Sequence, residues 1–200
     1  ASLSTIAAAR DSKRMRASSY DRTGGNDDRI HVQPGETFTF FDVKGAGCVT
    51  HIWITLANDD IIEEKHYLRK SVLRFYWDGE EEPSVLAPTG DFFGMGHAMS
   101  RNFVSEPLQM SPEDGRGFNC WFPMPFESGA RMTITNESGR ELLFYYYVDY
   151  EEYDSLPGDL LRFHAKWNRQ LPTDGISEDQ CSSHRDWCFG GKNITGKDNY

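Results

Sequence analysis

The stretch Pro88–His97 holds the side chains of this sequence that are best suited to recognise a ligand. It places one carboxylate, Asp91, beside Phe92 and Phe93, and it ends at the imidazole of His97. Its three glycines allow close approach of the backbone. Aromatic rings offer faces for stacking, and carboxylate and imidazole groups offer hydrogen bonds. This combination is typical of a pocket for a carbohydrate.

A purely structural interpretation of the same stretch is also open. Phe92 and Phe93 could plug the end of a β-sandwich, while Asp91 caps a turn. His97 could be an ordinary residue of a surface loop. The residue types alone are compatible with both interpretations.

A second polar stretch, Arg16–Arg29, precedes the first expected strand. Gly24 and Gly25 indicate a sharp turn within it, and long ordered loops of this kind often serve a function. Asn26 and Asp28 are its candidate ligand contacts, because amide and carboxylate oxygens accept hydrogen bonds from hydroxyl groups. Asp28 could equally cap the turn.

The spacing of apolar residues predicts an all-β protein, a jelly-roll β-sandwich in which turns rich in Gly, Pro and Asn join short strands. A short helix or arm is expected at the N-terminus, around residues 4–15. We expect strands near residues 37–43, 48–56, 67–77, 117–122, 131–135 and 141–150.

Alternation within residues 48–56 places four side chains on one face of a strand, and we expect Trp53 to serve packing rather than a ligand. These four residues are Val49, His51, Trp53 and Thr55. The segment Trp121–Phe126 contains two prolines, so we expect it at an edge or a strand end, as an exposed apolar patch on a monomer. Residues 160–167 could form a final strand.

Composition excludes several classes of protein. The net charge of −10 repels phosphate backbones, so no nucleic-acid partner is expected. No run approaches the roughly 18 apolar residues of a membrane span, so no membrane partner is expected either. The four cysteines form no CxxC pair, and we expect no metal and no cofactor. Cys48 and Cys120 are predicted to be buried thiols, whereas Cys181 and Cys188 could form a small disulfide.

The chain divides into three expected segments. Residues 1–29 form an N-terminal arm and polar loop, and residues 30–170 form the jelly roll. The polar residues 171–200 are expected to be a connection towards a second jelly roll that is not present in this chain.

Five stretches follow one another along the chain: SSYDRTGGNDD, WDGEEEPSV, APTGDFFGMGH, FNCWFPMPF and LLRFHAKW. In this order and spacing they resemble glycoside hydrolase family 172, and the resemblance covers about residues 16–172. Together the five stretches are specific, although none would be so alone.

The resemblance implies a double jelly-roll subunit that assembles into trimers and hexamers. It also implies hydrolysis of furanosides, such as fructofuranosides or arabinofuranosides, with retention at the anomeric carbon. The family's two catalytic glutamates belong to a Trp-Trp-Gly-Glu-Gly-Asp segment and a Gly-Thr-Glu-Asp-Tyr segment of the second jelly roll. Neither segment occurs in this sequence, and Glu80, Glu81 and Glu82 do not match them. The catalytic glutamates are therefore expected outside this chain.

A retaining glycosidase needs two carboxyl groups about 5–5.5 Å apart, and further groups that hold the sugar. On this hypothesis Asp91, Asn26 and Asp28 grip hydroxyl groups, Phe92 covers an apolar face, and His97 orients a carboxylate or hydroxyl. The alternative is a non-catalytic carbohydrate-binding or oligomer-assembly module, which needs no carboxylate pair.

Overall fold

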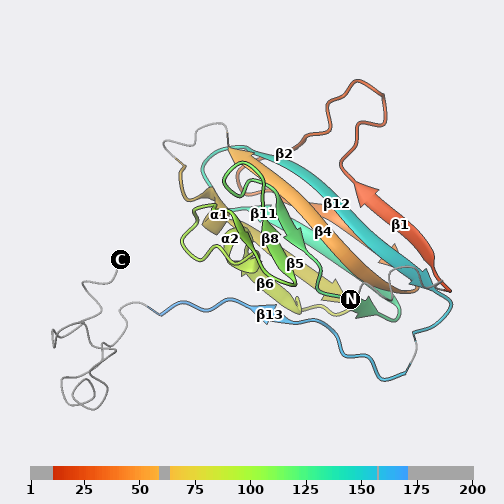
Figure 1. The fold of residues 1–200 in the computed structure, drawn as a ribbon. Coiled ribbons are helices and arrows are strands. Elements are labelled where there is room, and N and C mark those ends of the chain that lie inside the picture. Colours follow the sequence, from red (N-terminus) through yellow and green to blue (C-terminus); the bar gives the residue numbers. More distant parts are fainter. Residues whose placement is uncertain (1–10, 59–63, 157, 171–200) are drawn as a thin grey trace, which may run out of the picture. The chain divides into compact units, whose positions relative to one another are not determined.

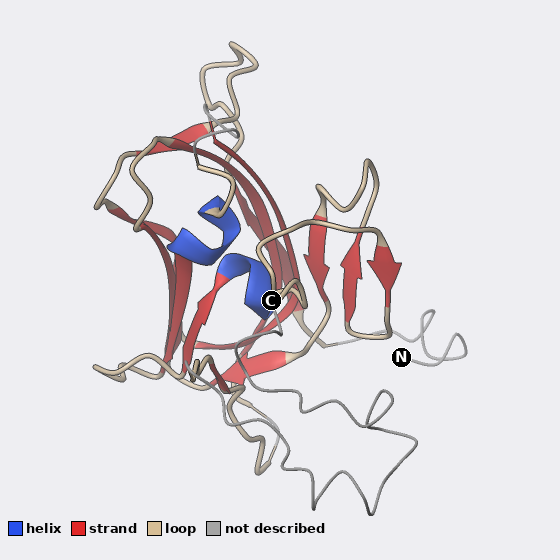
Figure 2. Ribbon diagram, turned by 90° about the vertical axis from the view of Figure 1, so that its left-hand side faces the viewer, coloured by secondary structure: helices blue, strands red, loops and turns tan. Residues whose placement is uncertain are grey.

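The computed structural model describes residues 11–58, 64–156 and 158–170, and its elements belong to one compact unit that ends at Trp167. Two sheets face each other as a sandwich, with two short helices between them at one end (Figures 1 and 2). This arrangement confirms the predicted all-β, jelly-roll-like class.

The larger sheet has eight strands in the described part of the chain. Its order is β1 (Lys13–Ser18), β12 (Leu142–Tyr153), β4 (Ala46–Asn58), β9 (Phe118–Cys120), β8 (Leu108–Met110) and β7 (Phe103–Val104). Beside this path, β10 (Met124–Phe126) pairs with β4 and β2 (Ile30–Val32) pairs with β12.

The smaller sheet has five strands among the described residues, and it carries the helices that lead to the site. Its order is β13 (Ala165–Lys166), β6 (Val85–Pro88), β5 (Ser71–Trp77), β11 (Gly129–Asn136) and β3 (Thr37–Lys44). Helix α1 (Tyr67–Lys70) precedes β5, and helix α2 (Thr89–Phe92) follows β6. Most pairings are antiparallel, whereas β13 lies parallel to β6.

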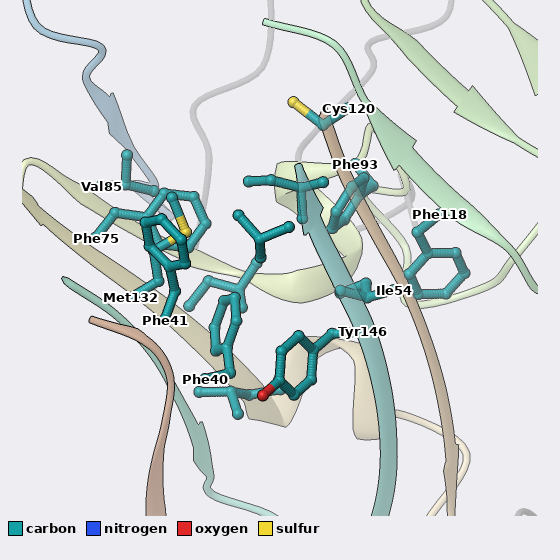
Figure 3. Close-up of a cluster of buried hydrophobic side chains, with 14 of the residues drawn as sticks. Phe40, Phe41, Ile54, Phe75, Val85, Phe93, Phe118, Cys120, Met132 and Tyr146 are labelled. Atoms are coloured by element: carbon teal, nitrogen blue, oxygen red, sulfur yellow. The ribbon is translucent and has the colours of Figure 1, made fainter. Parts of the chain in front are cut away.

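Aromatic rings from both sheets form the core (Figure 3). Phe40 of β3 lies edge-on to Phe144 of β12, with ring centroids 5.4 Å apart, and edge-on to Phe75 of β5 at 6.3 Å. Edge-to-face pairs of this kind contribute about 0.5–1.5 kcal/mol beyond the burial of their area. The fully buried Trp77 donates its indole N–H to the carbonyl of Phe163 at 2.7 Å, so this large ring brings no unpaired polar group into the core.

Two β-bulges adjust which residues face this core. Thr50 is the extra residue of β4, since Asp149 pairs with His51 and Tyr150 with Val49. The bulge turns Val49 into the core while His51 stays half-buried on the outer face. The expectation that Val49 shares a face with His51, Trp53 and Thr55 is therefore wrong at Val49, because strict alternation fails where a residue is inserted.

Several local expectations also need correction. Residues 13–15 lie in strand β1 rather than in a helix, because they pair with β12; residues 1–10 lie outside the described residues. The expected strand 67–77 begins with the helical turn α1 and becomes a strand only at Ser71. Near the expected strand 117–122 only residues 118–120 are paired as β9. Of residues 160–167, only Ala165 and Lys166 are in a strand.

The segment Trp121–Phe126 is not the exposed apolar patch that we expected. Met124, Pro125 and Phe126 are buried where β10 pairs with β4, whereas Pro123 and Trp121 are exposed, Trp121 to 40%. The two prolines do lie beside and within a three-residue strand away from the main path of the sheet, as their missing N–H groups favour.

The cysteine expectations have mixed outcomes. Cys120 is fully buried, and burial raises the pKa of its thiol to about 12. Cys48 is only half-buried, with its thiol 3.4 Å from the carbonyl oxygen of Val49. The possible pair Cys181 and Cys188 lies outside the described residues. None of the helices in the described ranges is long and apolar enough to cross a membrane.

The outer face of the larger sheet carries an ionic and aromatic network across three strands and the turn after β9. Arg16 binds both carboxylate oxygens of Asp149, at 2.5 and 2.9 Å. Asp149 also lies 3.1 Å from Nδ1 of His51, whose ring stacks on Trp121 at 5.1 Å. Burial raises the pKa of Asp149, but the hydrogen bonds and charges of Arg16 and His51 outweigh it, so the net pKa lies below the usual range.

We predict that Asp149→Asn lowers the free energy of unfolding at pH 7 by about 1–2 kcal/mol, because charge-assisted hydrogen bonds to Arg16 and His51 are lost. Since the pKa of Asp149 is lowered by folding, this stabilisation is present above the unfolded-state pKa and is lost as the pH falls through the folded-state value. Urea denaturation at pH 7 and pH 3 measures the loss of stability in the variant and its dependence on pH. The matched control Asp42→Asn, at an exposed strand position, should change stability by less than about 0.5 kcal/mol. Equal losses in the two variants at pH 7 would contradict the prediction.

Candidate functional site

The chain enters the candidate site through β6 and α2. Thr89 is buried and donates its hydroxyl to the carbonyl of Ser71 at 3.1 Å, which joins the start of α2 to β5. Close packing favours glycine at position 90, since a Cβ there would lie 3.0 Å from the carbonyl oxygen of Met95 and 3.2 Å from Cβ of Leu68. Gly94 ends the turn with a φ of +91°, which favours glycine. These local constraints present Asp91 and Phe92 at the edge of the core.

The carboxylate of Asp91 is held by two side chains from distant parts of the chain. Trp167 donates its indole N–H to Oδ1 at 3.1 Å. Arg69 places Nε 2.8 Å from Oδ2, close enough for an ion pair but misaligned for a hydrogen bond. Only 14% of the Asp91 side chain is exposed, so its charge lies mostly out of water.

Arg69 connects the three segments that meet at the site. Besides its ion pair with Asp91, its guanidinium donates to the carbonyl of Gly96 in the loop after α2. The same guanidinium lies 5.2 Å from the ring centroid of Trp167, a cation–π contact. Arg69 therefore holds α1, the α2 loop and the C-terminal segment (residues 158–167) together.

Asp91 and Trp167 border a hollow of about 220 Å³ between α2, β6 and the C-terminal segment. Aromatic rings form much of its wall, and Asp91 is the one carboxylate among its lining residues. The lining consists of Ala87, Asp91, Phe92, Phe122, Phe163, Ala165, Lys166 and Trp167. A small aromatic hollow with a few polar groups suits one ring of a small ligand.

Burial is the largest influence on the pKa of Asp91, and it raises that pKa above the usual range. The charge of Arg69 and the hydrogen bond from Trp167 act in the opposite direction but do not cancel it. Keeping Asp91 ionised at neutral pH is therefore a cost to folding. Perturbed carboxylates of this kind are found disproportionately at functional sites.

Two of the predicted site residues meet at this hollow, and a third is close by in the chain. Asp91 and Phe92 line the hollow, and the ring of Phe92 lies edge-on to Phe75 and Phe163 at 5.3 and 6.4 Å. Phe93 is fully buried in the core, as the structural alternative had it. His97 is exposed in the loop after α2.

The other two predicted residues lie elsewhere. Figure 1 shows the loop of residues 19–29 at the upper right, beyond β1, whereas α2 lies left of centre. Oδ1 of Asp28 accepts a hydrogen bond from the backbone N–H of Asp21 at 2.7 Å, which is the turn-capping role that the sequence left open. Asn26 is exposed, with a φ of +59°. The structure does not bring these residues to the hollow beside Asp91.

The partners of Asp91 were missed by the sequence analysis. Arg69 lies in a segment that we expected to be a strand, and Trp167 in one that could have formed a final strand. Charged residues such as Arg69 are common on surfaces, so only its tertiary contact reveals a role. The half-buried rings Phe122 and Phe163 carried a signal, since they lie in FNCWFPMPF and LLRFHAKW, two of the stretches that resemble the family.

Among the described residues, the groups that line this hollow suit binding of a ligand rather than cleavage with retention. No group of three or more His, Cys, Asp or Glu side chains in these ranges could hold a metal ion. The hollow offers a single carboxylate, whereas retention requires a close pair.

These features define a jelly-roll-like β-sandwich domain with an aromatic hollow built around one carboxylate. Residues 10–159, 150 of the 200, match the model of the GH172 first beta-sandwich domain. The chain therefore belongs to glycoside hydrolase family 172. A search of curated proteins found no match to this chain.

We predict that Asp91→Asn changes how stability depends on pH. Because folding raises the pKa of Asp91, the wild type should lose stability relative to the variant as the pH rises from about 3 through the folded-state pKa. The difference in Tm between the two proteins, recorded from pH 3 to 7, measures this trend. Asp149→Asn is the matched control and should show the opposite trend. If the difference in Tm between wild type and Asp91→Asn does not vary with pH, burial does not dominate the pKa of Asp91.

Proposed function

We propose that the protein acts in the hydrolysis of furanosides, such as fructofuranosides or arabinofuranosides, with retention at the anomeric carbon. In this proposal the first β-sandwich supplies groups that hold the sugar. Membership of a glycoside hydrolase family supports the reaction class, and the position of Asp91 within an aromatic hollow is the observation that carries the binding role.

The contacts of the hollow suggest a role for each group. Oδ1 of Asp91 can accept hydrogen bonds from sugar hydroxyls, and Phe92 and Trp167 can cover the apolar face of the ring. Arg69 would keep the carboxylate in place, since it contacts both Asp91 and Trp167. Asn26, Asp28 and His97 remain proposed contacts to parts of a substrate outside this hollow.

Cleavage itself needs a nucleophile and an acid about 5–5.5 Å apart. The lining supplies one carboxylate, so we propose that the catalytic glutamates come from a second jelly roll. Asp91 would then contribute through hydroxyl contacts that strengthen as the ring distorts towards the transition state.

A second candidate function is a carbohydrate-binding or oligomer-assembly module without chemistry of its own. The single carboxylate of the hollow favours it, because binding needs no acid pair. An assay of this chain and of the full-length gene product with a chromogenic furanoside separates the two. Activity confined to the longer protein supports our proposal, and activity in neither supports the module.

Assembly into a trimer or hexamer is a further part of the proposal, and it rests on family membership. The segment Trp121–Phe126 no longer supports it, because Met124, Pro125 and Phe126 are buried within the sandwich. Analytical ultracentrifugation at micromolar concentration measures the assembly, and a monodisperse monomer would contradict this part.

We predict that Asp91→Ala in the full-length protein lowers kcat/KM for a furanoside by about 2–4 kcal/mol of transition-state stabilisation, roughly 30- to 1,000-fold. Folding should survive, because the side chain lies at the edge of the core rather than within it. Steady-state kinetics and the Tm are measured together, with the exposed Asp154→Ala as the matched control. Full activity with an unchanged Tm would remove Asp91 from the site. A collapse of the Tm would instead assign it a structural role.

A further inference from the structure

A second hollow, of about 370 Å³, lies on the outer face of the smaller sheet. Cationic, anionic and phenolic side chains border this hollow together. Its lining consists of Asp42, Lys44, Tyr76, Gly79, Glu80, Ser128, Gly129, Ala130 and Arg131. Nothing in the proposed hydrolysis uses these residues.

The strand register explains why these side chains converge. Arg131 of β11 lies directly opposite Tyr76 of β5 on one side and Asp42 of β3 on the other. Lys44 lies opposite Gly129, two residues further along the same pair of strands. Side chains two residues apart share a face, so Asp42, Lys44 and Arg131 point to the same side of the sheet.

The guanidinium of Arg131 is held in place by an aromatic ring rather than by a carboxylate. Its Cζ lies 3.9 Å from the ring centroid of Tyr76, a close cation–π contact. Such a contact leaves the N–H donors of arginine available for an acceptor. In the part of the chain that the structure describes, neither Arg131 nor Lys44 forms an ion pair with a protein carboxylate. Two cationic side chains therefore border one hollow, and their N–H groups are available to donate hydrogen bonds to a ligand.

The hollow also carries acceptors. Asp42 is exposed and makes no hydrogen bond or ion pair within the described ranges. Glu80 uses one oxygen to accept the hydroxyl of Ser84 at 2.5 Å, which leaves its other oxygen. A simple anion would meet these carboxylates at a cost, so a plain phosphate or acetate site is disfavoured.

The other polar clusters contrast with this one. The carboxylate of Asp91 is engaged by Arg69 and Trp167, and that of Asp149 by Arg16 and His51. In those two clusters the charged side chains have partners within the protein. In the hollow beside Arg131 donors and acceptors face solvent side by side, which suits a ligand that carries both a negative charge and hydroxyl groups.

We infer that this hollow binds a sugar residue that bears a carboxylate, of the hexuronic acid class. Lys44 and Arg131 bind the sugar carboxylate, while Asp42 and Glu80 accept hydrogen bonds from its ring hydroxyls. The site is separate from the hollow at Asp91, and it would recognise an acidic residue of a glycan. The inference does not depend on the hydrolytic activity.

The test is a titration of the full-length protein with sodium glucuronate at low ionic strength. Isothermal titration calorimetry or ligand-observed NMR measures the binding. Glucose and sodium acetate are the comparison ligands, each lacking one half of the proposed recognition. We expect glucuronate to bind at least about tenfold more tightly than either, because charge-assisted hydrogen bonds to the carboxylate and hydroxyl contacts are both needed. Added salt should weaken the binding.

Variants assign the binding to this hollow. Arg131→Ala and Lys44→Ala should each weaken glucuronate binding by about tenfold or more. The matched control is Arg74→Ala, which removes an arginine from the same face of β5, two residues from Tyr76, where it bonds to Thr135 and Glu137. This control and Asp91→Ala should leave binding unchanged within about twofold. Lys44→Ala keeps the test informative if Arg131→Ala does not fold, because Lys44 is exposed.

Each other outcome overturns the inference. Absence of glucuronate binding means a merely solvated hollow, and equal binding of acetate means an anion site without sugar recognition. If glucose binds as tightly as glucuronate, Lys44 and Arg131 do not recognise the carboxylate. Loss of binding in Asp91→Ala but not in Arg131→Ala would place glucuronate in the first hollow instead.

Discussion

Contact between aromatic rings of the two sheets is the interaction on which the rest of this structure depends. Phe40 of the smaller sheet meets Phe144 and Tyr146 of the larger sheet, at 5.4 and 5.5 Å between ring centroids. A sandwich is stable only when its inner faces exclude water from each other, and large rings achieve this with few residues. The bulge at Phe40 makes this contact possible, since it buries Phe40 and Phe41 in succession.

The same aromatic packing extends from the core to the candidate site. Phe75 contacts Phe40 on one side and Phe92 on the other, and Phe92 in turn contacts Phe163. Phe163 lies 5.2 Å from Phe122 at the wall of the hollow. The hollow is thus the outer end of the hydrophobic core, and Phe92 in its wall packs against the buried rings of Phe75 and Phe93. Asp91 and Lys166 are the charged residues of its lining.

The sequence predicted the parts of this architecture that depend on local pattern. Strands β3, β4 and β11 largely alternate between apolar and polar residues, and β12 is a run of Leu, Phe and Tyr with high β-propensity. The positions of these long strands therefore followed within a few residues. Asp91 and Phe92 could be selected because the mixture of carboxylate, rings and glycines is itself local. The partners Arg69 and Trp167 could not, because 22 and 76 residues separate them from Asp91 and only the fold brings them together. The bulge at Thr50 was missed as well, although two successive polar residues, Thr50 and His51, interrupt the apolar alternation between Val49 and Ile52.

The C-terminal segment forms one wall of the hollow, yet it is tied to the smaller sheet by only two paired residues of β13. Side-chain contacts complete its attachment, through the ion pair of Arg162 with Asp78 at 2.5 Å and the bond from Trp77 to the carbonyl of Phe163. A segment held in this way opens at a lower free energy than the strands beside it. Its backbone amides at Ala165 and Trp167 would exchange with deuterium through local opening, before those of β5 and β11. The lifetime of the closed wall, and with it the residence time of anything bound there, is then set by this segment rather than by the unfolding of the sandwich.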